Sequence, residues 1–385
     1  MDWTPGLALQ FALITMLPGF AISALATWWI RSRADRWGLV DQPGVRKVHT
    51  NPTPLGGGLG IWLGLVVPLA LGHGAVWLIA RSVTGPEQLP EFLRFAWPHL
   101  AGFQTKAGDL WAILGLGTLL VLVGLWDDRK GLAWQVRLGV QFGVAAVVVW
   151  GLGWKLSLFM PIPLLPELLT LLWIVGLINS FNMLDNMDGL SAGVATIASL
   201  MLATVLLLAP DPITQGPQLF IAGFLFVLVG STLGFLWHNR PPAKIFMGDS
   251  GSYLIGFCMA VMTVVATFAG TEVQRQHAIL APLFILAVPL YDMTTVLWIR
   301  LREGRSPFQP DKCHFSHRLV ELGFTKPQAV LVIYLLTGTC GLGALILHRV
   351  DRLGAVFITL LVLSVLALIA MLESAARRRV KQTET

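Results

Sequence analysis

Eleven apolar runs are the feature that most constrains the fold of this chain. They lie at roughly 7–29, 55–80, 108–126, 134–152, 167–184, 189–209, 217–237, 251–269, 278–299, 328–348 and 354–372. A helix of about 20 apolar residues spans a hydrocarbon core, and a helix pairs its own backbone groups where no water can. Only 12% of the residues are charged, against about 25% in a typical soluble domain. We therefore expect an all-α polytopic membrane protein with about eleven transmembrane helices.

Little of the chain lies outside these runs, so the sequence predicts a single domain over residues 1–385. The motifs described below fall within 31–327, the last two helices within 328–372, and a basic tail occupies 373–385. The first run is preceded by Asp2 and no Lys or Arg, so we expect a retained helix rather than a cleaved signal. The three cysteines are far apart in sequence and imply no disulfide framework.

The positions of Lys and Arg predict the orientation in the membrane. If the N-terminus lies outside, the outer segments contain only seven of the 27 basic residues: Arg81, Arg94, Lys106, Lys155, Arg275, Arg349 and Arg352. Cytoplasmic loops carry the excess of Lys and Arg in membrane proteins, so we expect the N-terminus outside and the C-terminus in the cytoplasm. Basic residues scattered over short loops suit anionic headgroups or a phosphate-bearing substrate. They argue against nucleic-acid binding.

A polar stripe separates two of the apolar runs. Asn179, Asn182, Asp185 and Asp188 recur every third residue, which places them along one side of a helix. Helix caps and turns explain one or two such residues, but not four in register. The stripe is therefore a candidate site for a cation or a polar ligand.

Further acidic residues stand at other predicted helix ends. Asp127 and Asp128 end the third run, and adjacent carboxylates there are costly unless they share a cation or a proton. Asp249 opens the eighth run, either as a helix N-cap or as a ligand of Mg²⁺. Asp292 lies inside the ninth run, and we favour a supporting role for it behind the site.

The orientation assigned from Lys and Arg alone puts all these carboxylates on the cytoplasmic face. His314, His317 and the Gly56–Gly58 turn fall there too. Zinc is not favoured, because Cys313 and the two histidines lack a fourth ligand and a usual zinc spacing. Carboxylates among basic loops suit a metal-bridged polyphosphate, with Arg and Lys holding the phosphates. A site at the membrane surface suggests one lipid substrate and one soluble substrate.

Taken together, the motifs resemble the polyprenyl-phosphate N-acetylhexosamine-1-phosphate transferases of glycosyltransferase family 4. The resemblance covers about Arg46 to Leu319 and follows the family order: Asp127-Asp128, Asn179-x-x-Asn182-x-x-Asp185-x-x-Asp188-Gly189, Asn239, Phe246-Met-Gly-Asp249-x-Gly-Ser252 and His314-x-x-His317-Arg318. It implies transfer of a sugar-1-phosphate from a UDP-N-acetylhexosamine to undecaprenyl phosphate at the inner (plasma) membrane. Release of UMP and a requirement for Mg²⁺, with Mn²⁺ as an alternative, are implied with it. The oligomeric state stays open, with a homodimer among the options.

The resemblance also implies roles for individual residues. Asp249 and Asn182 would bind the metal, and Asp127 or Asp128 would orient or activate the lipid phosphate. The uridine would contact Asp188, Asn239 and Phe246. Phosphates and sugar would contact Lys47, His49, Arg137, His314, His317 and Arg318. The catalytic residues implied by the resemblance are Asp127, Asp128, Asp185, His314 and His317, and direct attack and a covalent Asp intermediate both stay open.

Two positions depart from the family pattern. The family often has Gly where Asn186 stands and a third His where Ser316 stands. The His-x-x-His-Arg-Leu form is closer to the GlcNAc-1-phosphate branch than to the muramoyl-pentapeptide branch, which we keep as an alternative. A transporter of an anionic solute is the alternative from another class. It is disfavoured because the charges gather at one face and the two halves of the chain show no repeat.

Overall fold

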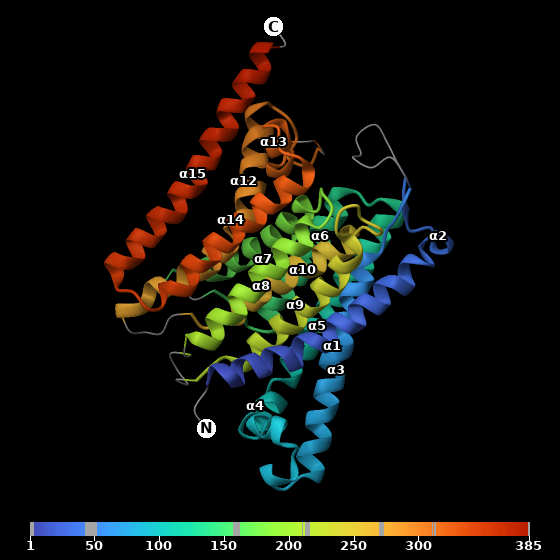
Figure 1. Ribbon diagram of the computed structural model, residues 1–385, viewed down its shortest axis with the longest axis vertical. Coiled ribbons are helices and arrows are strands. Elements are labelled where there is room, and N and C mark those ends of the chain that lie inside the picture. The colour runs from blue at the N-terminus through green and yellow to red at the C-terminus, as the bar shows by residue number, and fades with distance from the viewer. Residues whose placement is uncertain are drawn as a thin grey trace.

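The computed structural model describes residues 4–42, 52–156, 162–209, 211, 216–268, 273–309, 311 and 313–383. The chain forms a bundle of long helices, with the start of α1 and the end of α15 at opposite ends (Figure 1). In order, the α-helices are α1 (Pro5–Arg31), α2 (Ala34–Trp37), α3 (Gly57–Ser82), α4 (Leu100–Thr105), α5 (Ala107–Lys130), α6 (Trp134–Ala146), α7 (Leu165–Leu184), α8 (Leu190–Leu208), α9 (Leu219–Asn239), α10 (Gly248–Val265), α11 (Ala281–Ile285), α12 (Ala287–Arg302), α13 (Phe315–Glu321), α14 (Lys326–Leu347) and α15 (Arg352–Thr383).

Shorter elements complete the described chain. Strands β1 (Val40–Asp41) and β2 (Thr53–Pro54) form an antiparallel ribbon in which Val40 pairs with Pro54. The segments η1 (Pro86–Gln88), η2 (Glu91–His99) and η4 (Val273–Leu280) are 3₁₀ turns, and η3 (Val147–Gly151) is a π-helical turn that prolongs α6. The all-α prediction is confirmed, since the ribbon is the only sheet in the described residues.

Within the described residues, nine helices are long and apolar enough to cross a membrane: α1, α3, α5, α7, α8, α9, α10, α14 and the Arg352–Ser374 part of α15. The predicted run at 278–299 is a bent pair, Gln276–Ile285 and Ala287–Arg302, with a 68° break. The predicted run at 134–152 is α6 followed by the π turn, and it falls short of this length criterion. The polytopic membrane architecture is confirmed, with nine or ten such helices in place of eleven.

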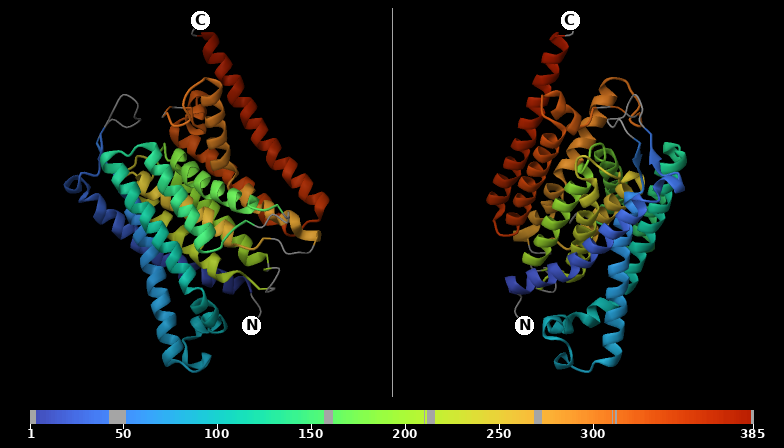
Figure 2. Two further views of the ribbon diagram at one scale, coloured as in Figure 1. Left: turned by 180° about the vertical axis from the view of Figure 1, so that it is seen from behind. Right: turned by 45° about the vertical axis from the view of Figure 1, so that its right-hand side comes forward.

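The most deeply buried of the membrane-spanning helices are α10, α8 and α9. Helix α10 packs against α5, α7 and α3, and α8 packs against α9 and α14 (Figure 2). In α10, every residue from Ser250 to Val264 is buried. By contrast, α1 and α15 expose large apolar side chains along their outer faces, among them Leu9, Leu25, Leu361 and Leu368. Exposed leucines on outer helices suit contact with lipid, so the polar groups are sequestered inside the bundle.

Glycines let α1 and α9 pack with their backbones in close approach. A Cβ atom at Gly230 would lie 2.1 Å from the Met16 carbonyl oxygen, and one at Gly234 would lie 2.4 Å from that of Phe20. Ser23 Oγ donates to the carbonyl of Ser231 at 2.7 Å in the same crossing. Small residues at a helix crossing are the usual means of close packing in membranes, where lipid supplies no hydrophobic drive between helices.

We expect Gly230→Ala to destabilise the protein, because its new methyl group must displace the α1 backbone. Overpacking of this kind costs about 1–3 kcal/mol, so the melting temperature in detergent should fall by several degrees. The matched control is Gly115→Ala on α5, where an added Cβ meets nothing within 4 Å. Equal melting temperatures for the two variants would show that the α1–α9 contact is looser than described.

Candidate active site

The two carboxylates that end α5 have different surroundings. Asp127 is buried and accepts from Leu132 N at 2.7 Å, Arg137 Nη1 at 3.1 Å and the Tyr253 hydroxyl at 3.1 Å. Asp128 instead accepts from the backbone N–H groups of Asp249 at 2.8 Å and Ser250 at 3.3 Å. The Asp128 carboxylate therefore caps the first turn of α10, where free N–H groups favour a negative charge.

This cap requires helix backbones to approach one another closely. A Cβ atom at Gly124 would lie 2.4 Å from Ser250 Cα, and one at Gly58 would lie 2.2 Å from the nitrogen of Gly251. The glycine-rich start of α3 also donates through Gly57 N to the Phe246 carbonyl at 2.9 Å. The predicted glycine turn thus lies against the Asp249 segment, and it serves packing in the described structure.

The polar stripe at the end of α7 divides into two parts. Asn179 Nδ2 donates to Gln141 Oε1 at 2.6 Å, so Asn179 joins α7 to α6. Asn182 Nδ2 donates to Asp249 Oδ1 at 2.6 Å and to Ser252 Oγ at 3.0 Å. Because α7 ends at Leu184, Asp185 and Asp188 stand on the turn that follows rather than on the same helical face. The stripe forms a junction: Asn179 links α7 to α6, whereas Asn182, Asp185 and Asp188 line the same cavity.

Asn239 holds two loops together beside this junction. Its Oδ1 accepts from Gly189 N at 2.8 Å, and its Nδ2 donates to the Ile245 carbonyl at 2.8 Å. Asp188 Oδ2 accepts from Ala243 N at 2.9 Å in the same region. Gly189 has φ +75°, a conformation that glycine adopts readily. The turn carrying Asp185 and Asp188 is therefore fixed against the turn that leads into Phe246.

A cavity of about 1000 Å³ lies where these loops meet, at the end of the bundle. It is lined by Asp41, Thr53, Leu55, Asp128, Asn182, Asp185, Asn186, Met187, Asp188, Asn239, Pro241, Pro242, Ala243, Phe246, Gly248, Asp249, Asp311, His314, His317, Lys326, Pro327 and Val330. Six of these lining residues carry a carboxyl group and one is a lysine, so the cavity wall is predominantly acidic. Such a wall favours cationic partners or proton uptake.

Among the groups outside the membrane-spanning helices, Asp185 shows the tendency to keep a proton most clearly. Burial raises its pKa to about 8, and the charges of Asp128 and Asp188 act in the same direction, against a hydrogen bond from Gly248 N. In the described residues, no set of three or more His, Cys, Asp or Glu side chains forms a preformed metal cage. Mg²⁺ typically binds through one or two carboxylates and keeps waters or substrate phosphates as its other ligands.

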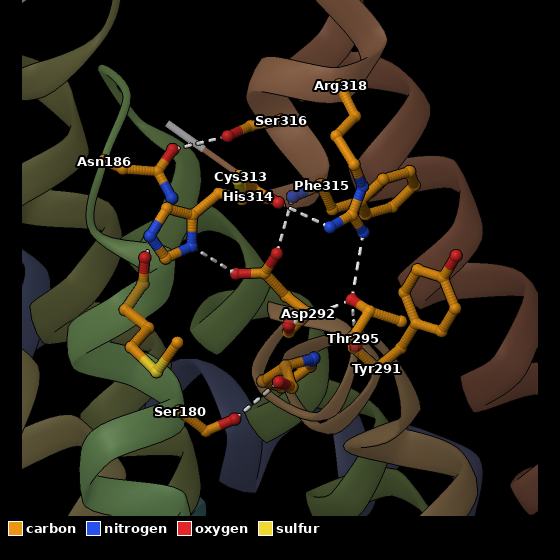
Figure 3. A network of polar contacts seen from close by, with 12 residues as sticks. Ser180, Asn186, Tyr291, Asp292, Thr295, Cys313, His314, Phe315, Ser316 and Arg318 are labelled. Atoms are coloured by element: carbon orange, nitrogen blue, oxygen red, sulfur yellow. Dashed lines mark hydrogen bonds and ion pairs between the residues drawn. The ribbon is translucent and has the colours of Figure 1, made fainter. Parts of the chain in front are cut away.

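The second wall of the cavity comes from α13 and the residue before it. His314 Nδ1 lies 3.0 Å from Asp292 Oδ2, and Phe315 N donates to Asp292 Oδ1 at 2.6 Å (Figure 3). Because a carboxylate only accepts, His314 donates through Nδ1 and keeps Nε2 for a ligand. His314 and His317 both line the cavity, with ring centroids 6.3 Å apart.

Arg318 has partners on the other side of α13. Its Nη2 donates to Thr295 Oγ1 at 3.0 Å, and its Nε lies 3.1 Å from Glu373 Oε2 on α15. Glu373 also accepts from the Tyr291 hydroxyl at 2.9 Å. Arg318 is 3% exposed, so in this structure it attaches α13 to α12 and α15 instead of lining the cavity.

Most of the predicted site residues converge. Those that line the cavity are Asp128, Asn182, Asp185, Asp188, Asn239, Phe246, Asp249, His314 and His317. Asp127 and Arg137 lie just behind its wall, with Arg137 Nη1 3.8 Å from Asp249 Oδ2. Lys47 and His49 lie outside the described residues.

Sequence reasoning missed several contributors. Tyr253, Glu373, Asp311 and Lys326 carry no motif of their own, and only their contacts reveal them. One signal was available for Glu373, which is the single acidic residue of the 32-residue helix α15. An isolated carboxylate at the end of an apolar helix implies a buried partner.

A carboxylate-lined cavity at the end of a bundle of membrane-spanning helices is the kind of site expected of a membrane-embedded enzyme. The sequence profile of glycosyl transferase family 4 matches residues 110–267. The decaprenyl-phosphate N-acetylglucosaminephosphotransferase of Mycolicibacterium smegmatis is 35% identical over 367 residues, covering 89% of this chain and 84% of the relative. The probable undecaprenyl-phosphate N-acetylglucosaminyl 1-phosphate transferase of Bacillus subtilis is 30% identical, covering 93% and 92%.

The undecaprenyl-phosphate alpha-N-acetylglucosaminyl 1-phosphate transferase of Escherichia coli is 29% identical over 330 residues, which cover 82% of this chain and 78% of the relative. The chain therefore belongs to glycosyl transferase family 4, and it is a phosphotransferase. This membership supports the predicted reaction class over the transporter alternative.

We expect Asp185→Asn to stabilise the metal-free protein at alkaline pH. In the folded chain Asp185 keeps its proton up to a pKa of about 8, whereas an unfolded aspartate loses it near 4. The folded state binds more protons between these values, so stability falls as pH rises through that window. An amide has no such dependence. The melting temperature of the variant in EDTA should therefore exceed that of the wild type increasingly from pH 5 to pH 8, and a constant difference would contradict the assignment.

Proposed function

We propose that this protein transfers N-acetylglucosamine-1-phosphate from UDP-N-acetylglucosamine to undecaprenyl phosphate. The β-phosphorus of the UDP-sugar loses its bond to the bridging oxygen and gains one to the lipid phosphate oxygen, either in one step or by way of a covalent Asp intermediate. UMP leaves, and a lipid-diphosphate-linked sugar is formed that initiates a cell-envelope polysaccharide. The observation that carries the proposal is the carboxylate-lined cavity at the bundle end. It is supported by the relatives named for GlcNAc-phosphate transfer.

The donor set of the cavity fits Mg²⁺, with Mn²⁺ as a substitute. Asn182 Nδ2 donates to Asp249 Oδ1 at 2.6 Å, which keeps the two side chains together, and Asp128 and Asp185 contribute further oxygen groups to the same wall. Hard oxygen ligands are those that Mg²⁺ prefers. When bound, the ion would neutralise the diphosphate and stabilise the charge that develops on the departing phosphate oxygen.

Other side chains of the cavity are suited to bind the lipid phosphate, the uracil and the sugar-linked phosphate. Asp128 lies at the α10 cap, where it is suited to orient the lipid phosphate. Phe246 offers a ring on the cavity wall for the uracil, and Asp188 and Asn239 lie beside it. His314 presents Nε2, which accepts a hydrogen bond in the neutral ring and would donate one to the sugar-linked phosphate once the ring takes up a second proton. Each of these assignments follows the family resemblance and agrees with the position of the residue.

The reaction requires the cavity to face the compartment that holds UDP-sugars. We propose that it lies on the cytoplasmic face of the inner membrane, with the N-terminus outside, because most Lys and Arg fall in the loops at that end. The extended segment of η2 and α4 lies at the opposite end of the molecule from α13 (Figure 1), and so would face outward.

The direct test is transfer by the purified protein in detergent with undecaprenyl phosphate, Mg²⁺ and labelled UDP-GlcNAc. We expect label in the lipid phase with an equimolar amount of UMP, and loss of both on addition of EDTA. Transfer from UDP-MurNAc-pentapeptide in place of UDP-GlcNAc would assign the enzyme to the peptidoglycan branch. Absence of transfer from either donor, or from other UDP-N-acetylhexosamines, would overturn the proposal.

We further expect Asp249→Asn to lower turnover by at least about a hundredfold, because the charge that anchors the metal is lost. Mg²⁺ should also raise the melting temperature of the wild type, since a ligand that binds only the folded state stabilises it. That increase should be absent in Asp249→Asn. Asp109→Asn is the matched control, because Asp109 begins α5 at its other end and pairs with Lys106 at the surface. Unchanged turnover in Asp249→Asn would refute the metal site.

A further inference from the structure

Helix α13 is attached on one side to two helices of the C-terminal part of the chain, α12 and α15. Asp292 on α12 holds its first turn through His314 and the N–H of Phe315 (Figure 3). Glu373 on α15 holds it through Arg318. Both attachments fix α13 to the C-terminal helices. Neither of them fixes the distance between α13 and the acidic turn that forms the opposite wall of the cavity.

A third contact bridges the two walls. Ser316 Oγ donates to Asn186 Oδ1 at 2.5 Å, and Asn186 Nδ2 donates to the Met183 carbonyl at 2.8 Å. Figure 3 shows Ser316 and Asn186 facing each other, with His314 beside them. Both the oxygen and the nitrogen of the Asn186 side chain are thus hydrogen-bonded. This one amide therefore links the last turn of α7 to α13.

The location of the Ser316–Asn186 bond allows it to affect the geometry of the site. Asn186 follows Asp185 directly and lines the cavity, whereas Ser316 is 1% exposed and precedes His317. A buried hydroxyl without its acceptor is costly, so the bond resists separation of the two elements. A change in its length would move the acidic turn relative to both histidines.

The two partners come from distant parts of the chain. These positions are 130 residues apart in the chain, yet the structure brings them into contact.

We propose that Asn186 and Ser316 form a positioning pair that sets the separation between the acidic turn and the histidine helix, and thereby the fit of the sugar-phosphate part of the donor. The kinetic part of this inference rests on the proposed function, while the structural part stands without it. Neither residue is a catalytic residue, because each acts through neighbours: Asn186 through Asp185 and Asp188, and Ser316 through His314 and His317. Loss of the bond should therefore weaken donor binding more than it slows the chemical step.

The test is a double-mutant cycle of Asn186→Ala, Ser316→Ala and the double variant. We expect each single variant to raise the KM for UDP-GlcNAc by about tenfold with a smaller change in kcat, and the double variant to match the singles instead of multiplying them. Ser191→Ala is the matched control. It also removes a buried hydroxyl, one that donates to the Phe181 carbonyl at 3.1 Å and so joins α8 to α7 instead of to α13.

Hydrogen exchange of the 313–322 segment gives a readout that needs no turnover. We expect faster exchange of the α13 amides in both single variants, no further increase in the double variant, and wild-type exchange in Ser191→Ala. Unchanged or additive exchange would overturn the pairing even if the enzyme is active. Coupled exchange with additive KM effects would overturn its role in donor binding. An inactive wild type would count against the proposed function, and the exchange data would still decide whether the pair positions α13.

Discussion

The contact between the Asp128 carboxylate and the first turn of α10 is the interaction on which the site depends. It places the end of α5 against the start of α10, so that carboxylates 121 residues apart share one wall of the cavity. The contact is possible only because Gly124 and Gly58 leave room for the α10 backbone. A carboxylate from a distant helix thus caps the N-terminus of α10. The same contact packs α5 against α10 and positions the carboxylates of the site.

The acidic residues fall into two groups according to their partners. Asp127, Asp311 and Glu373 form ion pairs with Arg137, Arg300 and Arg318, respectively, and these pairs tie helix ends and loops together. In the described part of the chain, Asp128 and Asp185 have no such pair. A cavity wall with unpaired carboxylates is unstable at neutral pH unless a cation or protons compensate it. The carboxylates that tie helix ends and loops together are thus mostly distinct from Asp128 and Asp185 on the cavity wall, and Asp311 belongs to both groups.

Membrane helices were predictable because hydropathy and helix length impose them segment by segment. The run at 278–299 became a bent pair and the run at 134–152 a short helix with a π turn, since neighbouring helices can satisfy a break that hydropathy does not reveal. Within the site, the carboxylates and both histidines were predictable as a group. The position of Arg318 was not, because its partner Glu373 stands 55 residues further along and lacks any local pattern.

The sequence by itself determined the class of fold, the reaction family and the set of polar groups that gather at one face. These follow from local hydropathy and from motifs whose order is read along the chain. Only the tertiary structure decided which of adjacent residues faces the cavity, as with Asp127 behind the wall and Asp128 on it, or Asn179 apart from Asn182. It also decided that Asn186 and Ser316 meet. Such pairings depend on the relative rotation and approach of helices distant in sequence, and spacing along the chain does not encode them individually.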